Sequence, residues 1–283
     1  MTRILSGKEV AAALNLRLKE EVQALANEHI FPRLATVRVG AREDDISYEK
    51  GASKRCANVG VGIENIVLPE DVTQEELLNT INRLNADDSI HGILLFRPLP
   101  GHIDDKTVRN SISAEKDIDG ITDRSMIGIY TGEDIGFPPC TPQACLEILD
   151  HYGIEVAGRN AVVIGRSLVV GKPAAMMLIK RNATVTICHT RTADMPAVVR
   201  RADIVIVSAG RAELIGKEYL REGQIVLDVG INVNDAGKLC GDVKYDEAVD
   251  VVEAITPVPG GVGTVTTSVL VKHVVEAAKR RLR

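Results

Sequence analysis

The chain has 283 residues, enough for two domains with cores of their own, and 45% are hydrophobic, as in ordinary globular proteins. The net charge is −5, only 3% of residues are aromatic and none is Trp, so neither a polyanion-binding surface nor a nucleic-acid stacking platform is expected. The 5 cysteines are scattered without Cys-x-x-Cys or Cys/His spacing. They indicate reduced thiols, not a disulfide framework or a metal site.

The N-terminal residues lack the apolar core of a signal peptide, and no apolar run approaches the length that spans a membrane. We therefore expect a cytoplasmic protein whose partners include neither nucleic acid nor a membrane.

Strand and helix patterns alternate through the first half of the chain, which predicts a parallel sheet. Apolar residues at helical spacing predict an amphipathic opening helix, and Thr73 with Glu76 forms a candidate capping box at the start of a later helix. The expected elements are strands at 34–40, 62–68 and 92–97 and helices at 7–28, 48–59 and 73–85, with a polar acidic loop at 42–47.

The alternation lapses between Asp119 and Thr141, where a Gly- and Pro-punctuated connection at 128–142 predicts a domain boundary. The final helix, at 266–281, has an apolar stripe that needs a surface to cover, so we expect it to pack on the first domain. The fold class is α/β, with two α/β domains, the second a Rossmann-type parallel sheet. The predicted limits are 1–140 plus the C-terminal helix at 264–283 for the first domain, and 141–263 for the second.

One stretch of the second domain organises the prediction of function. A β-branched run from residue 161 leads into a loop with Gly165 and Gly171, then Pro173 at a first helical turn, then a second β-branched run at 183–192. Glycines let the loop backbone approach a pyrophosphate, and the N-terminus of the following helix favours negative charge. Ser167 stands where the usual Gly-x-Gly-x-x-Gly motif has its middle glycine, so an ordinary strand-to-helix turn is the alternative.

The end of the second run favours NADP over NAD. Folds that prefer NAD usually place an acidic residue there to hold the ribose, but this chain has none between 162 and 193. Thr190, Arg191 and the loop residue Arg166 stand there instead, and arginine forks suit a phosphate. The alternative is that these arginines only solvate a loop.

Three features could supply a substrate site. They are Lys54, Asp119 within Lys116–Gly120, and the Pro-Gly-Gly loop within 255–263, whose prolines fix φ while its glycines allow close backbone approach. A single lysine is more often a solvated surface charge, and Asp119 before a glycine could be only a turn former.

The order of several motifs resembles the methylenetetrahydrofolate dehydrogenase/cyclohydrolase family from about residue 7 to the C-terminus. The motifs are Lys116-Asp-Ile-Asp-Gly120, Pro139-Cys-Thr-Pro142, Gly165-Arg-Ser-x-x-x-Gly-x-Pro173, Asp228-Val-Gly-Ile-Asn232, Gly241-Asp-Val243 and Thr256-Pro-Val-Pro-Gly-Gly-Val-Gly263. The resemblance implies NADP-dependent oxidation of 5,10-methylenetetrahydrofolate to the methenyl cation and hydrolysis to 10-formyltetrahydrofolate. It also implies a homodimer, formed mainly through the nucleotide domains.

The resemblance also assigns roles to residues. It gives Lys54 as the active-site lysine and Asp119 as the aspartate that holds the pterin ring, with tetrahydrofolate derivatives as substrates. The remaining expected site residues are Tyr48, Lys50, Phe96, Pro259, Gly260 and Gly261 for the folate, and Gly165, Arg166, Ser167, Gly171, Pro173, His189, Thr190, Arg191 and Ile231 for NADP.

Two positions depart from the family pattern. Lys50 stands four residues before Lys54, where the family usually has tyrosine, and a tyrosine occurs at Tyr48 instead. Phe96 replaces a glutamine that in the family is thought to hydrogen-bond the lysine. A ring and a second ammonium beside a lysine would both lower its pKa. Hydride transfer should survive these changes, so the alternative function is a dehydrogenase that has lost the hydrolytic step.

Two further alternatives belong to other classes. A folate- or nucleotide-binding protein without turnover would keep the same loop, but retention of Lys54 and Asp119 argues against it. A dehydrogenase for a small hydroxy acid would need a proton-relay base, and no His–Asp pair indicates one.

Overall fold

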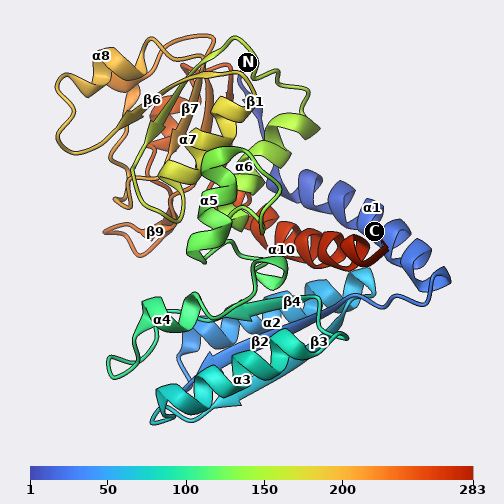
Figure 1. Ribbon diagram of the computed structural model, residues 1–283. Coiled ribbons are helices and arrows are strands. Elements are labelled where there is room, and N and C mark those ends of the chain that lie inside the picture. Colours follow the sequence, from blue (N-terminus) through green and yellow to red (C-terminus); the bar gives the residue numbers. More distant parts are fainter. Residues whose placement is uncertain (283) are drawn as a thin grey trace. The chain divides into compact units, whose positions relative to one another are not determined.

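The computed structural model describes residues 1–282 (Figure 1). The chain forms two compact units: unit 1 contains Met1–Ala12 and Thr141–Thr266, and unit 2 contains Ala13–Cys140 and the residues from Thr267 onward. Each unit contains a parallel sheet, as the α/β prediction requires.

Unit 2 is built on a three-stranded parallel sheet in the order β3-β2-β4. One face buries Val37 against Leu77 of α3 in an aliphatic core. On the other face Thr36 donates to Glu49 of α2 (2.9 Å), and Arg38 pairs with the same carboxylate (3.4 Å), so α2 covers this face. The elements are α1 (Gly7–Asn27), β2 (Arg33–Val39), α2 (Glu43–Val59), β3 (Gly62–Leu68), α3 (Gln74–Ala86), β4 (Gly92–Leu95), α4 (Asp105–Arg109), a 3-10 turn (Ala114–Lys116) and α5 (Asp123–Thr131).

The last helix, α10 (Val262–Lys279), belongs to unit 2 from Thr267 onward. Lys279 pairs with Glu21 of α1 (2.8 Å), and the buried His273 donates from Nδ1 to the carbonyl of Ile118 (2.8 Å). The expectation that the final helix packs on the first domain is confirmed.

Unit 1 contains a six-stranded, all-parallel sheet in the order β1-β11-β8-β7-β5-β6. Its core is rich in β-branched residues such as Val162, Ile164, Val205 and Val226, as expected for a parallel sheet covered on both faces. The elements are β1 (Arg3–Ile4), α6 (Cys140–His151), β5 (Asn160–Ile164), α7 (Gly171–Lys180), β6 (Thr184–Cys188), α8 (Met195–Val199), β7 (Ile204–Val207), a 3-10 turn (Lys217–Tyr219), β8 (Ile225–Asp228), a hairpin of β9 (Asn232–Val233) and β10 (Leu239–Cys240), α9 (Tyr245–Ala248) and β11 (Ala254–Ile255).

The structure differs from the sequence prediction at three places. Helix α2 begins at Glu43, not at residue 48, because the acidic stretch supplies its first turn, where negative charge is favoured by the helix dipole. Helix α5 lies in the stretch expected to be an irregular connection, and Thr122 caps it by accepting from the Ser125 N–H. The first twelve residues group with unit 1 because Arg3 and Ile4 pair in parallel with β11.

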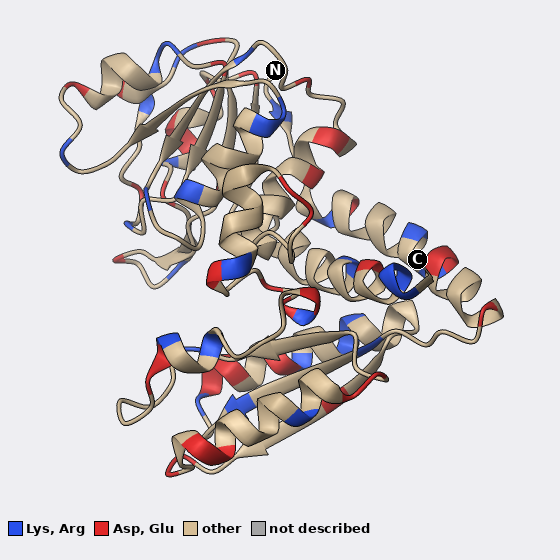
Figure 2. Ribbon diagram, viewed as in Figure 1, with Lys and Arg blue, Asp and Glu red and all other residues tan. Residues whose placement is uncertain are grey.

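Basic and acidic residues are interspersed along the helices and loops of each unit (Figure 2). Among residues 1–282, no helix has the length and apolar character needed to cross a membrane.

Candidate functional site

The predicted strand, glycine loop, helix and strand are present as β5, the loop at 165–170, α7 and β6. Gly165 has φ +124°, and a Cβ there would lie 2.4 Å from the carbonyl oxygen of Ser208. At Gly171 a Cβ would lie 2.2 Å from the carbonyl oxygen of Gly165. Both glycines are therefore required for the loop to fold back on itself at the start of α7.

Ser167 shapes the same loop. Its Oγ accepts from the N–H of Val170 (3.0 Å), so the residue that replaces the usual middle glycine closes the turn. Pro173 is the third residue of α7, where its missing N–H costs no helical hydrogen bond. A glycine loop that leads into a helix at the carboxyl edge of a parallel sheet is the usual place for binding a pyrophosphate.

The expected phosphate-binding residues lie at the carboxyl ends of two paired strands. Arg166 follows β5, and Thr190 and Arg191 follow β6, whose Cys188 pairs with Ile164. All three are exposed. The turn after β6 is fixed by His189, whose N–H donates to Thr192 Oγ1 (2.8 Å) and whose Nδ1 accepts from the Arg191 N–H (3.1 Å). His189 therefore shapes the site through its neighbours.

A pocket of about 130 Å³ opens farther along the same sheet edge, beyond β8 and β11. Gly7 supports its wall: its N–H donates to the Gly260 carbonyl (2.8 Å), and a Cβ on Gly7 would lie 2.0 Å from the Gly261 carbonyl oxygen. The pocket brings together four predicted site residues, Ile231, Pro259, Gly260 and Gly261, with Leu239 of the hairpin.

Two buried carboxylates, of Asp228 and Asp242, hold the loops around this pocket, and neither was predicted as a site residue. Asp228 accepts from the N–H groups of Gly230 (2.9 Å), Asp242 (3.0 Å) and Val243 (2.9 Å). Asp242 accepts in turn from the three N–H groups of residues 209–211 after β7. Burial raises the pKa of Asp228 to about 6, although its hydrogen bonds lower it. The motifs Asp228–Asn232 and Gly241–Val243 thus fix the loops that surround the pocket.

A second cluster lies within unit 2, at the carboxyl edge of its sheet. Tyr48 of α2 meets Phe96, just past β4, edge to face with ring centroids 6.0 Å apart. Burial raises the pKa of the Tyr48 hydroxyl well above its usual value, and nearby Asp119 and Cys140 raise it further.

Asp119 lies at the N-terminus of α6. Burial raises its pKa to about 6, against the lowering effect of hydrogen bonds from the thiol and backbone N–H of Cys140. Its protonation therefore changes just below neutral pH. Tyr48, Phe96 and Asp119 are brought together as predicted, and Cys140 is a neighbour that the prediction did not include.

The expected role of Lys54 as the active-site lysine stays a prediction. Successive residues of a helix turn by about 100°, so the residue one turn after Tyr48 is Ala52, and Ala52 is fully buried. Lys54 and Lys50 are exposed.

Unit 1 has a parallel sheet with a glycine loop after β5, and exposed basic side chains follow β5 and β6. These features are typical of dinucleotide-binding α/β proteins. The tetrahydrofolate dehydrogenase/cyclohydrolase catalytic-domain model matches residues 5–119, and that family's NAD(P)-binding-domain model matches residues 139–282. This chain therefore belongs to the tetrahydrofolate dehydrogenase/cyclohydrolase family.

Relatives match over nearly the whole chain. The bifunctional protein FolD of Alkaliphilus oremlandii is 47% identical over 279 residues, covering 99% of this chain and 98% of the relative. The bifunctional protein FolD of Clostridioides difficile is 48% identical over 277 residues, 98% of this chain and 96% of the relative.

Solved structures agree. The bifunctional FolD enzyme of Campylobacter jejuni superposes with a TM-score of 0.96 at 41% identity, covering 99% of this chain and all of the other. The Trypanosoma brucei methylenetetrahydrofolate dehydrogenase-cyclohydrolase, solved with NADP and an inhibitor, has a TM-score of 0.91 at 35% identity, covering 100% and 99%.

Proposed function

We propose that this protein oxidises 5,10-methylenetetrahydrofolate to 5,10-methenyltetrahydrofolate with NADP, and hydrolyses that product to 10-formyltetrahydrofolate. The observation that carries the proposal is the full-length match to bifunctional relatives together with an intact glycine loop at the sheet edge.

The nucleotide site belongs to unit 1. Gly165 and Gly171 leave room that a Cβ would fill, which suits the close approach of a pyrophosphate. Arg166, Thr190 and Arg191 would hold the additional phosphate of NADP, because guanidinium groups remain charged and match phosphate oxygens.

The pocket beyond β8 and β11 would take the nicotinamide end, since it lies farther along the same carboxyl edge. Its lining residues Ile231 and Leu239 offer apolar contacts to a planar ring, and the 257–261 backbone offers polar ones. When bound, NADP supplies the hydride acceptor. The residues around it need only orient and shield the reacting atoms, because the folate nitrogen lone pair expels the hydride.

The folate site draws on unit 2. The Asp119 carboxylate would accept hydrogen bonds from the pterin amino and ring N–H groups. The Tyr48 and Phe96 rings provide an aromatic corner next to it. Above its pKa of about 6 Asp119 is ionised and fit for this role.

A second candidate function is a dehydrogenase without hydrolysis, suggested by the departures from the family pattern at Lys50 and Phe96. The position one turn after Tyr48 holds the buried Ala52, whereas Lys54 is exposed. Phe96 adds apolar surface at the same place.

A single reaction separates the two functions. Purified protein is mixed with 5,10-methylenetetrahydrofolate and NADP, and NADPH, methenyl and 10-formyl products are followed against an enzyme-free control. Formyl product forming faster than the control supports both activities. NADPH with methenyl decay at the control rate supports the dehydrogenase alone, and no NADPH or NADH with either cofactor refutes both.

We also propose that the protein is a cytoplasmic homodimer joined mainly through its nucleotide domains, as family resemblance suggests. Sedimentation equilibrium would give the assembly state. A monomer at micromolar concentration would contradict the dimer.

A further inference from the structure

We propose that Lys116 and Asp117 are positioning residues for Asp119: they fix the segment that carries it, and the negative charge of Asp117 acts on its carboxylate. This inference rests on the proposed function, in which Asp119 holds the folate. Asp119 belongs to the motif Lys116-Asp-Ile-Asp-Gly120, in which Lys116 and Asp117 are the first two residues.

Lys116 anchors the segment to the end of α3. It is 7% exposed, and its Nζ donates to the carbonyl oxygens of Leu84 (2.8 Å), Asn85 (2.8 Å) and Asp87 (2.7 Å). These carbonyls lie at the helix C-terminus, where backbone acceptors lack helical partners and a cation is favoured. All three ammonium protons are used, so Lys116 is tied to one place.

Asp117 anchors the other side of the segment, at the start of α5. It is fully buried, and its carboxylate accepts from the N–H groups of Ile121 (3.0 Å) and Thr122 (2.8 Å) and from the Ser125 hydroxyl (2.6 Å). The Asp117 backbone also bridges to Ile93 of β4 in parallel. The sheet and α5 therefore hold Asp117 together.

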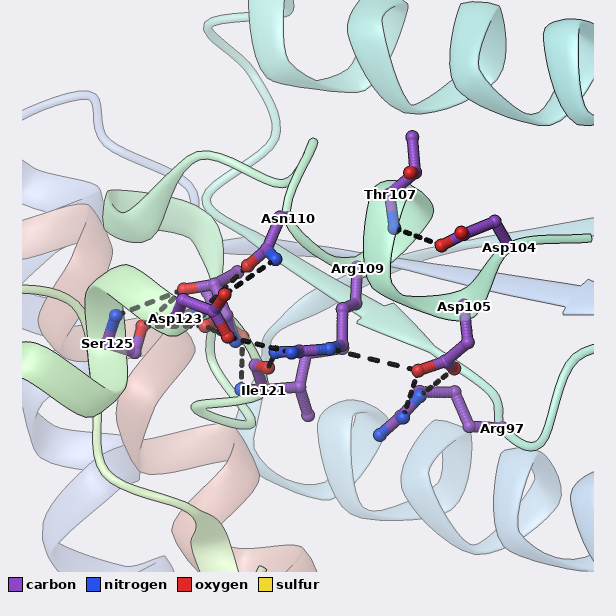
Figure 3. A network of polar contacts seen from close by, with 11 residues as sticks. Arg97, Asp104, Asp105, Thr107, Arg109, Asn110, Ile121, Asp123 and Ser125 are labelled. Atoms are coloured by element: carbon purple, nitrogen blue, oxygen red, sulfur yellow. Dashed lines mark hydrogen bonds and ion pairs between the residues drawn. The ribbon is translucent and has the colours of Figure 1, made fainter. Parts of the chain in front are cut away.

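The polar network in Figure 3 supports the same turn from outside. Arg109 donates to the carbonyl of Ile121 (2.6 Å) and pairs with Asp123 (2.7 Å), which also accepts from Asn110 (3.0 Å). The turn that follows Asp119 is thus held through its backbone N–H by Asp117 and through its carbonyl by Arg109.

Asp119 lies between these anchors with little freedom of its own. The preceding carbonyl, of Ile118, accepts from His273, and the following Gly120 has φ +63°. A Cβ on Gly120 would lie 2.5 Å from the Phe137 carbonyl oxygen. Loss of either anchor would therefore shift the carboxylate itself.

The charged and titratable groups around Asp119 come from several elements. Asp117 on the same segment raises its pKa, whereas Arg97 after β4 and Cys140 of α6 lower it, and the hydroxyl of Tyr48 on α2 lies near it. His273 of α10 lies 3.8 Å from the Cys140 thiol. Because Asp117 carries the same charge as Asp119, its neutralisation favours ionised Asp119.

Equilibrium binding provides a test that does not depend on turnover. The Kd of tetrahydrofolate is measured by calorimetry from pH 5 to 8 for the wild type, Asp117→Asn and Glu115→Gln, and the Kd of NADP is measured for the same proteins. For Asp117→Asn we expect folate binding about tenfold weaker at pH 7.5, since an Asn amide would oppose the N–H donors. The pH below which this variant loses folate binding should be about one unit lower than in the wild type.

Glu115→Gln is the matched control, because it removes an exposed carboxylate two residues before Asp117. Its folate curve should equal that of the wild type, and NADP affinity should be unchanged in both variants. A merely structural role for Asp117 would lower the melting temperature without moving the pH dependence.

Unchanged folate affinity and an unchanged acid limb in Asp117→Asn would overturn the inference while leaving the proposed function intact. Absence of folate binding in the wild type would sink the proposed function. If Asp117→Asn does not fold, Ser125→Ala removes one hydrogen bond and keeps the charge. For Ser125→Ala we then expect folate binding about threefold weaker, with its decrease at low pH at the same pH as in the wild type. If Ser125→Ala bound folate as tightly as the wild type, that result would count against the inference.

Discussion

Replacement of Lys54 by Met distinguishes a lysine that acts on substrate from one that only covers α2. Relative to Tyr48, Lys54 is turned by about 240° around an ideal helix, whereas Ala52 is turned by about 40° from it. Lys54 is exposed, while Ala52 is fully buried. Methionine keeps the length and helix propensity of lysine and removes only its charge.

The two interpretations differ by orders of magnitude. Removal of a general base costs about 10²- to 10⁴-fold in rate. A substitution at an exposed position changes stability by no more than about 0.5 kcal/mol, and we expect the rate to change by less than about twofold. Hydride transfer needs no protein base, so under the proposed function we expect the second result for the oxidation and the first result for the hydrolysis.

Initial rates of NADPH formation and of methenyl hydrolysis, each above the enzyme-free background, provide the measurement. Asp119→Asn serves as the positive control, because loss of its charge should weaken folate binding and lower kcat/KM in both assays. Hydrolysis by Lys54→Met at the wild-type rate would refute a role of Lys54 in that step.

Three further results are expected. Because the pKa of Asp119 is raised to about 6, kcat/KM for the folate should fall as pH drops below about 6, and a profile flat to pH 5 would contradict its role. Gly7→Ala should disturb the Pro-Gly-Gly loop, since its Cβ would meet the Gly261 carbonyl oxygen. We expect a loss of about 2 kcal/mol or more in urea unfolding together with reduced turnover. The pKa of buried Asp228 is about 6 when folded, against about 3.9 unfolded, so its contribution to stability is greatest below pH 4 and declines as pH rises to 6, by up to about 3 kcal/mol. Asp228→Asn should remove that part of the pH dependence of unfolding.

Much of the architecture could be predicted from local patterns. The strand, glycine loop, helix and strand of unit 1 follow from β-branched runs and from Gly165 and Gly171, whose need for a missing Cβ the structure shows directly. The apolar stripe of the last helix required a covering surface, and α10 finds it in unit 2. These features depend on short stretches, so the sequence carries them plainly.

Side-chain direction was harder to predict because it depends on register. The face of α2 that meets Phe96 is set by Tyr48 and continues through the buried Ala52, which the sequence alone did not indicate. The buried pair of Arg38 and Glu49 was also missed. Two ordinary charged residues on a strand and a helix give no sign of their pairing until both elements are placed.

The parallel strand formed by Arg3 and Ile4 has a consequence for how the chain folds. Its partners, Ala254 and Ile255, lie some 250 residues later, so this edge of the sheet closes only after both have been synthesised. Unit 2 likewise needs the residues from Thr267 onward. During synthesis the early segments therefore stay without these partners, and apolar surface left uncovered in this way favours aggregation.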